Sequence, residues 1–210
     1  LSLTVGEEIL LDDDELDLEA LREKMHLFQG KTVTACPSPG NYSEAFMKSA
    51  ESFCVTISEN LSGSYNSAVI ARDMVAEEGH VVHVINSKTA SAGEALIAYK
   101  LLEMIEDRMS FQMIKEQIEE FVNGVRTYFV LESLENLIKA GRLNKVAGKL
   151  ISALNIRPIM GEDGKGNIAF NSYARSRKQI LEKMAGFIKE SGKATKGENL
   201  VISHNNNLDM

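Results

Sequence analysis

Short apolar runs alternate with segments of helical periodicity through the centre of the sequence, and this alternation restricts the fold more than any other feature. Strands are expected at 53–58, at 81–85 and in "RTYFVLE", and helices at 65–76, 94–105 and 111–124. Strand-loop-helix units in series predict a parallel sheet with right-handed connections. The run at 81–85 is almost continuously apolar, which indicates burial on both faces. We therefore expect an N-terminal α/β domain of three α/β/α layers.

The flanking parts of the chain have different patterns. The first five residues are typical of an edge strand, Asp17 and Gly30 are expected to begin and end a helix, and another helix is expected from about Ser43. After residue 132 we expect two helices broken at Gly141, a hairpin of strands at 156–160 and 168–174, a helix at 178–191 and a strand at 200–203. This second pattern predicts a smaller α+β domain.

The predicted boundary lies near Lys139, which divides the chain into domains 1–138 and 139–210. The sequence starts without a methionine and stops just after an expected strand. We therefore expect both ends of the two-domain fold to be truncated.

Composition excludes several classes of protein. A net charge of −7 disfavours a nucleic-acid partner, because such binding relies on clustered Lys and Arg. Two cysteines without CxxC spacing form no disulfide framework, which favours a cytoplasmic setting. No metal-binding cluster is visible, and the apolar runs are shorter than the roughly 20 residues of a membrane-spanning helix. We expect no metal, no cofactor and no stable membrane insertion.

The loop in "ISENLSGSYNSA" places two hydroxyls around Gly63, between an expected strand and an expected helix. Ligands of open α/β sheets bind beyond the carboxyl ends of the strands, where Ser62 and Thr34 are expected. Free backbone N–H groups at a helix N-terminus, together with hydroxyls, suit a phosphate or a carboxylate. Ser and Thr are also the ordinary capping residues of helices, so position alone favours a purely structural role.

The sequence offers little support for catalysis. No GxxxxGK[ST], GxGxxG or GxSxG motif follows a predicted strand, so the usual nucleotide loops and nucleophile elbow are missing. Cys36 is interpreted as a packed loop residue, Cys54 as a core residue and His83 as a hydrogen-bonded strand residue. Of the four histidines, only His204 follows a strand where a site can use it.

Six segments, in order, resemble the DegV family of fatty-acid-binding proteins from bacteria. They are "TACPSPGNYSEAF", "ISENLSGSYNSA", "VHVINSKTASAGEA", "LESLENLIKAGRLNKVAGKLISALNIRPIM", "DGKGNI" and "SYARSRKQIL". The resemblance implies a two-domain protein that holds one long-chain fatty acid between its domains. It also implies that the protein presents the acid to a fatty-acid kinase and is itself no enzyme.

The resemblance also assigns site residues. Thr34 and Ser62 match the hydroxyls that bind the carboxylate, and Gly63 belongs to the same loop. Arg175 matches an arginine associated with the carboxylate end and the kinase partner, and His204 matches a strand-end histidine.

Two alternatives stay open. The same loops can serve as the anion hole of an enzyme acting on a small phosphorylated or carboxylated substrate, or the hydroxyls can be helix caps of a structural module.

Overall fold

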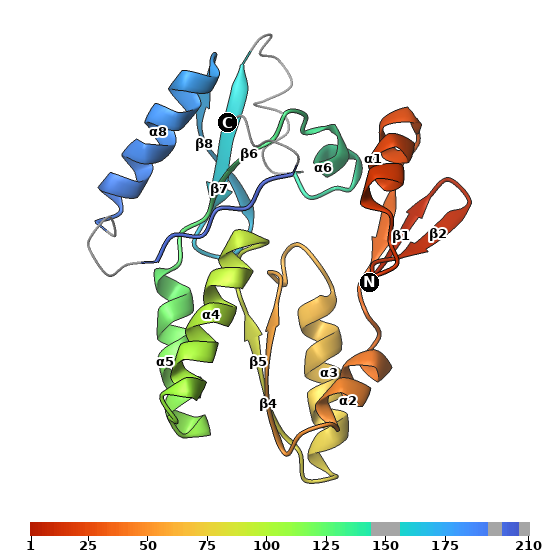
Figure 1. Cartoon of the computed structure of the whole chain (residues 1–210), viewed down its shortest axis with the longest axis vertical. Helices are drawn as coiled ribbons and strands as arrows, with labels where there is room; N and C mark the ends of the chain where they lie inside the picture. The colour runs from red at the N-terminus through yellow and green to blue at the C-terminus, as the bar shows by residue number, and fades with distance from the viewer. Residues whose placement is uncertain (144–155, 193–198, 206–210) are drawn as a thin grey trace.

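The computed structural model describes residues 1–143, 156–192 and 199–205. In the lower part of Figure 1, a parallel strand pair lies between helices. An antiparallel sheet flanked by a long helix lies above this pair, and a small antiparallel sheet lies to one side. The fold is mixed α/β, as the sequence predicts.

The N-terminal residues form a three-stranded antiparallel sheet of order β2-β1-β3, made of β1 (Ser2–Val5), β2 (Glu8–Leu11) and β3 (Val33–Ala35). The prediction of an edge strand here was wrong, because β1 pairs on both sides and β2 was not expected. The Asp17 carboxylate caps α1 (Leu18–Leu27) by accepting from the amides of Glu19 and Ala20, which confirms the predicted start.

The parallel pair consists of β4 (Glu51–Thr56) and β5 (Val81–Asn86), as predicted. Helices α2 (Pro39–Phe46) and α3 (Ser64–Ala76) cover one face, and α4 (Ala92–Glu106) and α5 (Phe111–Gly124) cover the other (Figure 1). Val82 and Val84 pack with the α2–α3 side, and Ile85 packs with the α4–α5 side. The expected three layers and the burial of β5 on both faces are confirmed. Helix α2 begins earlier than expected, because Ser38 and Asn41 form a capping box.

The third expected strand of the parallel sheet lies elsewhere. Strand β6 (Tyr128–Val130) joins β7 (Arg157–Glu162) and β8 (Ile168–Ala174) in an antiparallel sheet of order β6-β7-β8. Helix α8 (Arg177–Glu190) packs Ile180 against Ile159 and Ala174 of this sheet, and α6 (Glu135–Lys139) follows β6. The domain boundary near Lys139 stays a prediction, and the pairing of β6 favours an earlier position.

Two further predictions concern the C-terminal part. The hairpin of β7 and β8 and the following helix are confirmed. The strand predicted at 200–203 was wrong, since residues 199–205 have no strand conformation. The helix predicted after Gly141 lies largely outside the described residues.

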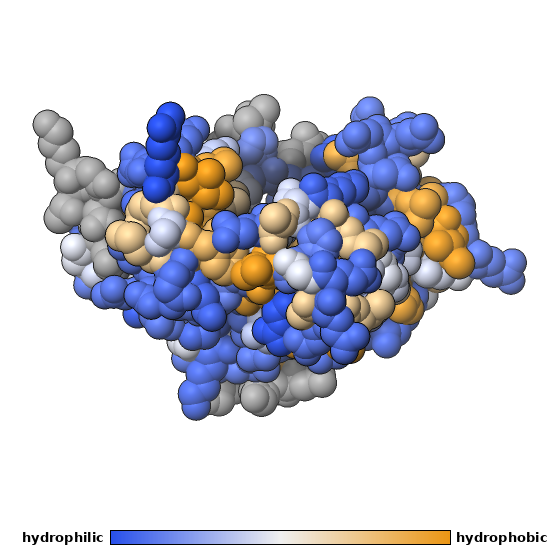
Figure 2. Space-filling model, turned by 90° about the horizontal axis from the view of Figure 1, so that it is seen from below, coloured by the Kyte–Doolittle hydropathy of each residue, from blue (hydrophilic) through white to orange (hydrophobic). Residues whose placement is uncertain are grey.

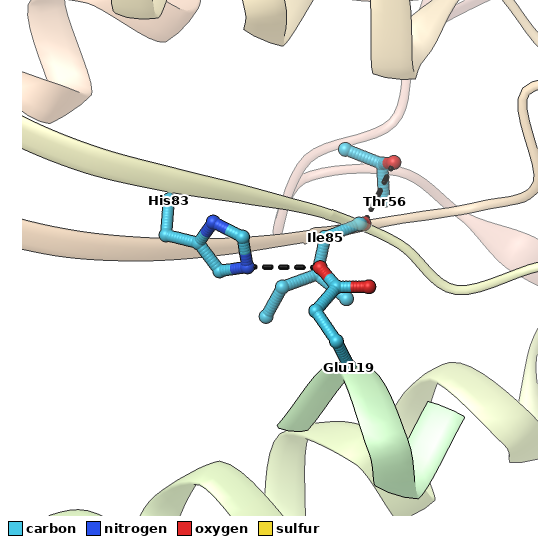
Figure 3. Close-up of polar contacts among 4 residues, drawn as sticks. All are labelled: Thr56, His83, Ile85 and Glu119. Atoms are coloured by element: carbon cyan, nitrogen blue, oxygen red, sulfur yellow. Dashed lines mark hydrogen bonds and ion pairs between the residues drawn. The ribbon is translucent and has the colours of Figure 1, made fainter. Parts of the chain in front are cut away.

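Strand β5 also carries a histidine that contacts a carboxylate of the neighbouring helix (Figure 3). His83 Nε2 lies 2.9 Å from Glu119 Oε1 of α5, and the Thr56 hydroxyl donates to the Ile85 carbonyl at 3.2 Å. Burial lowers the pKa of His83, although Glu119 opposes this effect. His83 is therefore a hydrogen-bonded strand residue, as the sequence predicts.

The surface carries scattered apolar side chains. Seen from below, hydrophobic residues form separate patches among hydrophilic ones (Figure 2). Exposed examples are Ile70 and Met74 of α3, and Leu102 and Ile105 of α4. Scattered exposure of this kind is ordinary in folded proteins. Within the described parts of the chain, no helix is long and apolar enough to cross a membrane.

Candidate functional site

The loop between β4 and α3 is a compact turn that delivers Ser62 to the start of a helix. The carbonyl of Ser58 accepts from the amides of Leu61 at 2.9 Å and Ser62 at 3.1 Å. The guanidinium of Arg142 donates through Nε to the Leu61 carbonyl at 3.1 Å. These bonds fix the backbone immediately before Ser62.

The Ser62 hydroxyl lies at the N-terminus of α3. Its Oγ is 2.9 Å from the Ser64 Oγ and accepts from the Ser64 amide at 3.3 Å. Gly63, the residue that precedes the helix, is exposed and offers no side-chain cap. Ser62 therefore has a local structural partner, and it also lies at the end of a helix where the first backbone N–H groups have no partner within the helix.

The strand that carries Thr34 ends beside the same helix. Thr34 is exposed in β3 and pairs with Leu3 of β1, so it lies in the antiparallel sheet and not at the end of a parallel strand as expected. Two residues later, the half-buried Cys36 places its Sγ 3.7 Å from the Ser67 hydroxyl of α3. A Cβ added at Gly63 would lie 3.3 Å from the Cys36 sulfur, so Gly63 lets the two segments approach. The structure thus brings the Thr34 segment and the Ser62 loop together, and Cys36 is packed as expected.

The loop after β5 completes this end of the parallel pair, and sequence reasoning did not identify its polar residues. Asn86 Oδ1 accepts from the amides of Glu59 at 3.3 Å and Lys88 at 3.2 Å, which ties the two loops together. Lys88 and Ser91 have φ values of 53° and 54°, in the left-handed region that non-glycine residues rarely adopt. Strained backbone of this kind concentrates at functional sites.

The helix after this loop begins with a half-buried acidic group. The Ser91 amide donates to Glu94 Oε2 at 2.8 Å. Burial raises the pKa of Glu94, and the Ser91 hydrogen bond opposes the increase. Glu94 is accounted for by this capping role.

The turn between β7 and β8 contacts the Ser62 loop, although more than a hundred residues separate them. The Ser58 hydroxyl donates to the Gly166 carbonyl at 2.8 Å, and Asn60 Nδ2 donates to the Lys165 carbonyl at 2.7 Å. Sequence reasoning recognised this hairpin turn but not its partner. The glycines of "DGKGN" were the one available signal.

His204 lies in the extended segment that crosses between the two parts of the molecule (Figure 1). Its neighbour Ser203 places Oγ 2.9 Å from the Ser91 Oγ, and Asn205 accepts from Arg22 Nε at 3.0 Å. His204 is exposed within this segment, which runs from the N-terminus of α4 to α1.

Arg175 lies apart from the Ser62 loop. It follows the last residue of β8, whereas the turn that contacts Ser58 precedes the first residue of that strand. Seven residues of strand span about 20 Å. Arg175 is exposed, and its amide donates to Gln179 Oε1 at 2.9 Å at the start of α8.

The described residues contain no group of three or more His, Cys, Asp or Glu side chains that could hold a metal ion. The hydrogen bonds described above at the ends of β4 and β5 come mainly from hydroxyls, side-chain amides and backbone N–H groups. The charged residues Glu59 and Lys88 lie in the same loops, and Glu94 lies in the first turn of α4. This chemistry can hold an anion by hydrogen bonds.

Comparison with known proteins places the chain in a family. The model of a family described as "Uncharacterised protein, DegV family" matches residues 1–210. A DegV domain-containing protein of Streptococcus gordonii is 38% identical over 210 residues, which cover 99% of this chain and 74% of the relative.

Solved structures of similar proteins support the same family assignment. A DegV-family protein of Ruminococcus gnavus, with vaccenic acid, has a TM-score of 0.86 at 38% identity, covering 90% of this chain and 68% of that one. The Streptococcus pneumoniae Fatty Acid Kinase (Fak) B3 protein loaded with linoleic acid has a TM-score of 0.87 at 32% identity, covering 92% and 69%. The chain belongs to the DegV family.

Proposed function

We propose that this protein binds one long-chain fatty acid, with the carboxylate at the Thr34 segment and the Ser62–Gly63 loop and the tail between its two domains. The observation that carries the proposal is that these two segments meet near the N-terminus of α3, where Cys36 contacts Ser67 and lies so close to Gly63 that an added Cβ there would touch its sulfur. It is supported by relatives of more than 30% identity that were solved with vaccenic and linoleic acids.

The chemistry of the loops suits a carboxylate. An ionised carboxylate is costly to remove from water unless hydrogen bonds replace its hydration. The hydroxyls of Thr34 and Ser62 and the first amides of α3 can supply these bonds without a metal ion. Burial of the tail contributes roughly 0.8 kcal/mol per methylene, so the tail supplies most of the affinity and the hydroxyls set the orientation.

The proposal extends to a carrier role. A protein that holds the tail by burial and the head by hydroxyls can leave the carboxylate within reach of a partner enzyme. One structural neighbour is a protein of a fatty-acid kinase system. We therefore propose that the chain presents its fatty acid to a cytoplasmic fatty-acid kinase and performs no catalysis itself, with Arg175 toward the kinase and His204 near the head group.

The test is the double variant Thr34→Ala, Ser62→Ala of this chain, measured by calorimetric titration with hexadecanoic acid. Loss of two hydrogen bonds to a charged group should weaken binding by on the order of a hundredfold. Ser110→Ala is the matched control, because Ser110 caps α5 by accepting from the Met113 amide, away from the proposed site.

The control separates ligand binding from helix capping. Ser110→Ala should lower the melting temperature and leave the affinity unchanged. If the double variant lowers the melting temperature but binds the acid as well as the unsubstituted chain does, the hydroxyls are only caps and the head-group assignment is wrong.

A further inference from the structure

The turn between β7 and β8 is held in a single conformation by its own hydrogen bonds. Asp163 Oδ1 accepts from the amides of Lys165 at 2.9 Å and Asn167 at 3.0 Å, and Oδ2 accepts from the Asn167 side chain at 2.8 Å. Gly164 and Gly166 adopt φ values of 76° and 83°, which glycine tolerates without strain. The turn is therefore ordered by its own hydrogen bonds, and it presents the backbone carbonyls of Lys165 and Gly166 to the neighbouring loop.

Those carbonyls, of Lys165 and Gly166, are the acceptors of the bonds from Asn60 and Ser58. Ser58 is fully buried at this contact, and Gly166 is buried as well. A Cβ added at Gly166 would lie 3.0 Å from the Lys88 Cα, so the turn also fits closely against the loop after β5. The turn fits between the two loops at the carboxyl ends of β4 and β5.

The same residues that contact the turn also set the position of Ser62. Ser58 Oγ donates to the turn and accepts from the Asn60 amide at 3.3 Å, while the Ser58 carbonyl accepts from the Ser62 amide at 3.1 Å. A shift of the turn would therefore move Ser58 and Asn60, and Ser62 with them. A donor misplaced by a fraction of an ångström loses much of its hydrogen-bond energy.

We propose that the β7–β8 turn positions the Ser62 hydroxyl for the ligand carboxylate, with Asn60 as a positioning residue that does not contact the ligand. The inference rests on the proposed function, and it adds a part of the C-terminal sheet to the head-group site. Under this proposal, recognition of the carboxylate depends on the contact between the β4-β5 sheet and the β6-β7-β8 sheet.

Asn60→Ala and Asn60→Asp test this role, since both remove the side-chain Nδ2 that donates to the turn. Because Asn60 is exposed, neither substitution leaves a cavity in the core. Hexadecanoic acid and its methyl ester are titrated into each variant. Loss of the positioning bond should weaken binding of the acid by about fivefold, or about 1 kcal/mol, and leave the ester unchanged. A general loss of structure would weaken both probes.

Lys165→Ala is the matched control, because Asn60 bonds to the backbone carbonyl of Lys165 and not to its exposed side chain. This variant should bind both probes like the unsubstituted chain, and melting temperatures of all variants report on folding. If the Asn60 variants bind the acid unchanged, or lose acid and ester equally, the positioning role is overturned. If the unsubstituted chain binds neither probe, the proposed function fails and this inference fails with it.

Discussion

Gly166→Ala measures how closely the β7–β8 turn fits between the two loops. Gly166 has a φ of 83°, and an added Cβ would lie 3.0 Å from the Lys88 Cα and 3.2 Å from the Ser58 Cβ, with the Ser58 Oγ closer still. The Lys88 atom belongs to the backbone, and the Ser58 side chain is fully buried. Neither neighbour can turn away into solvent.

The expected loss of stability has two parts. A left-handed conformation costs an alanine about 1–2 kcal/mol relative to glycine. Steric overlap in a well-packed region costs about 1–3 kcal/mol more. Gly164→Ala is the matched control, because Gly164 has a φ of 76° in the same turn but nothing within 4 Å of its added Cβ. Gly164→Ala should lose only the stability that the left-handed backbone conformation costs.

Urea unfolding followed by circular dichroism compares the two variants. Both replace glycine by alanine, so their effects on the unfolded chain cancel in the difference. Gly166→Ala should be less stable than Gly164→Ala by about 1–3 kcal/mol. Equal midpoints for the two variants would refute the close fit of the turn against Ser58 and Lys88.

Three other predictions concern the central layers. Burial lowers the pKa of His83, so the folded state binds fewer protons than the unfolded state. The melting temperature should therefore fall as the pH drops below about 6.5. In the His83→Gln variant, melting curves should show a smaller fall in melting temperature over the same pH range. Burial raises the pKa of Cys54 to about 11, so at pH 8 a Cys36→Ser variant should react with a thiol reagent only on unfolding, as mass spectrometry would show. Ile97→Ala removes a fully buried side chain and should cost about 2–5 kcal/mol in urea unfolding, against little for exposed Leu102→Ala.

The central α/β/α layers were predictable because their signals are local. Helix α5 lies at 111–124 as predicted, since its apolar positions recur at helical spacing and Gly124 ends the pattern. The apolar run of β5 correctly indicated burial on two faces. Strand β6 was recognised as a strand but assigned to the wrong sheet, because periodicity shows that a strand is half-buried and not which strand it pairs with.

The candidate site was predictable only in part. Ser62 follows from its position after a strand and from the family resemblance. Thr34 rests on the resemblance alone, because it lies within β3 of the antiparallel sheet and not beyond the end of a parallel strand. The roles of Asn60 and Gly166 depend on hydrogen bonds between residues 105 and 108 positions apart, which no local pattern can reveal. The strand expected at 200–203 fails for a related reason, because its apolar residues lie in an extended segment held by side-chain contacts at Ser203 and Asn205.

The contact between the turn and the Ser62 loop links ligand binding to the association of the two sheets. If the turn places Ser62 for the carboxylate, a bound carboxylate must stabilise the docked turn by the same free energy, because coupling between two sites is reciprocal. Hydrogen exchange of the chain with hexadecanoic acid should therefore show slower exchange at the Ser62 amide and in the turn at 163–167. The methyl ester, which lacks the charged head, should leave exchange at the turn unchanged. Equal protection by acid and ester would mean that the tail alone brings the sheets together.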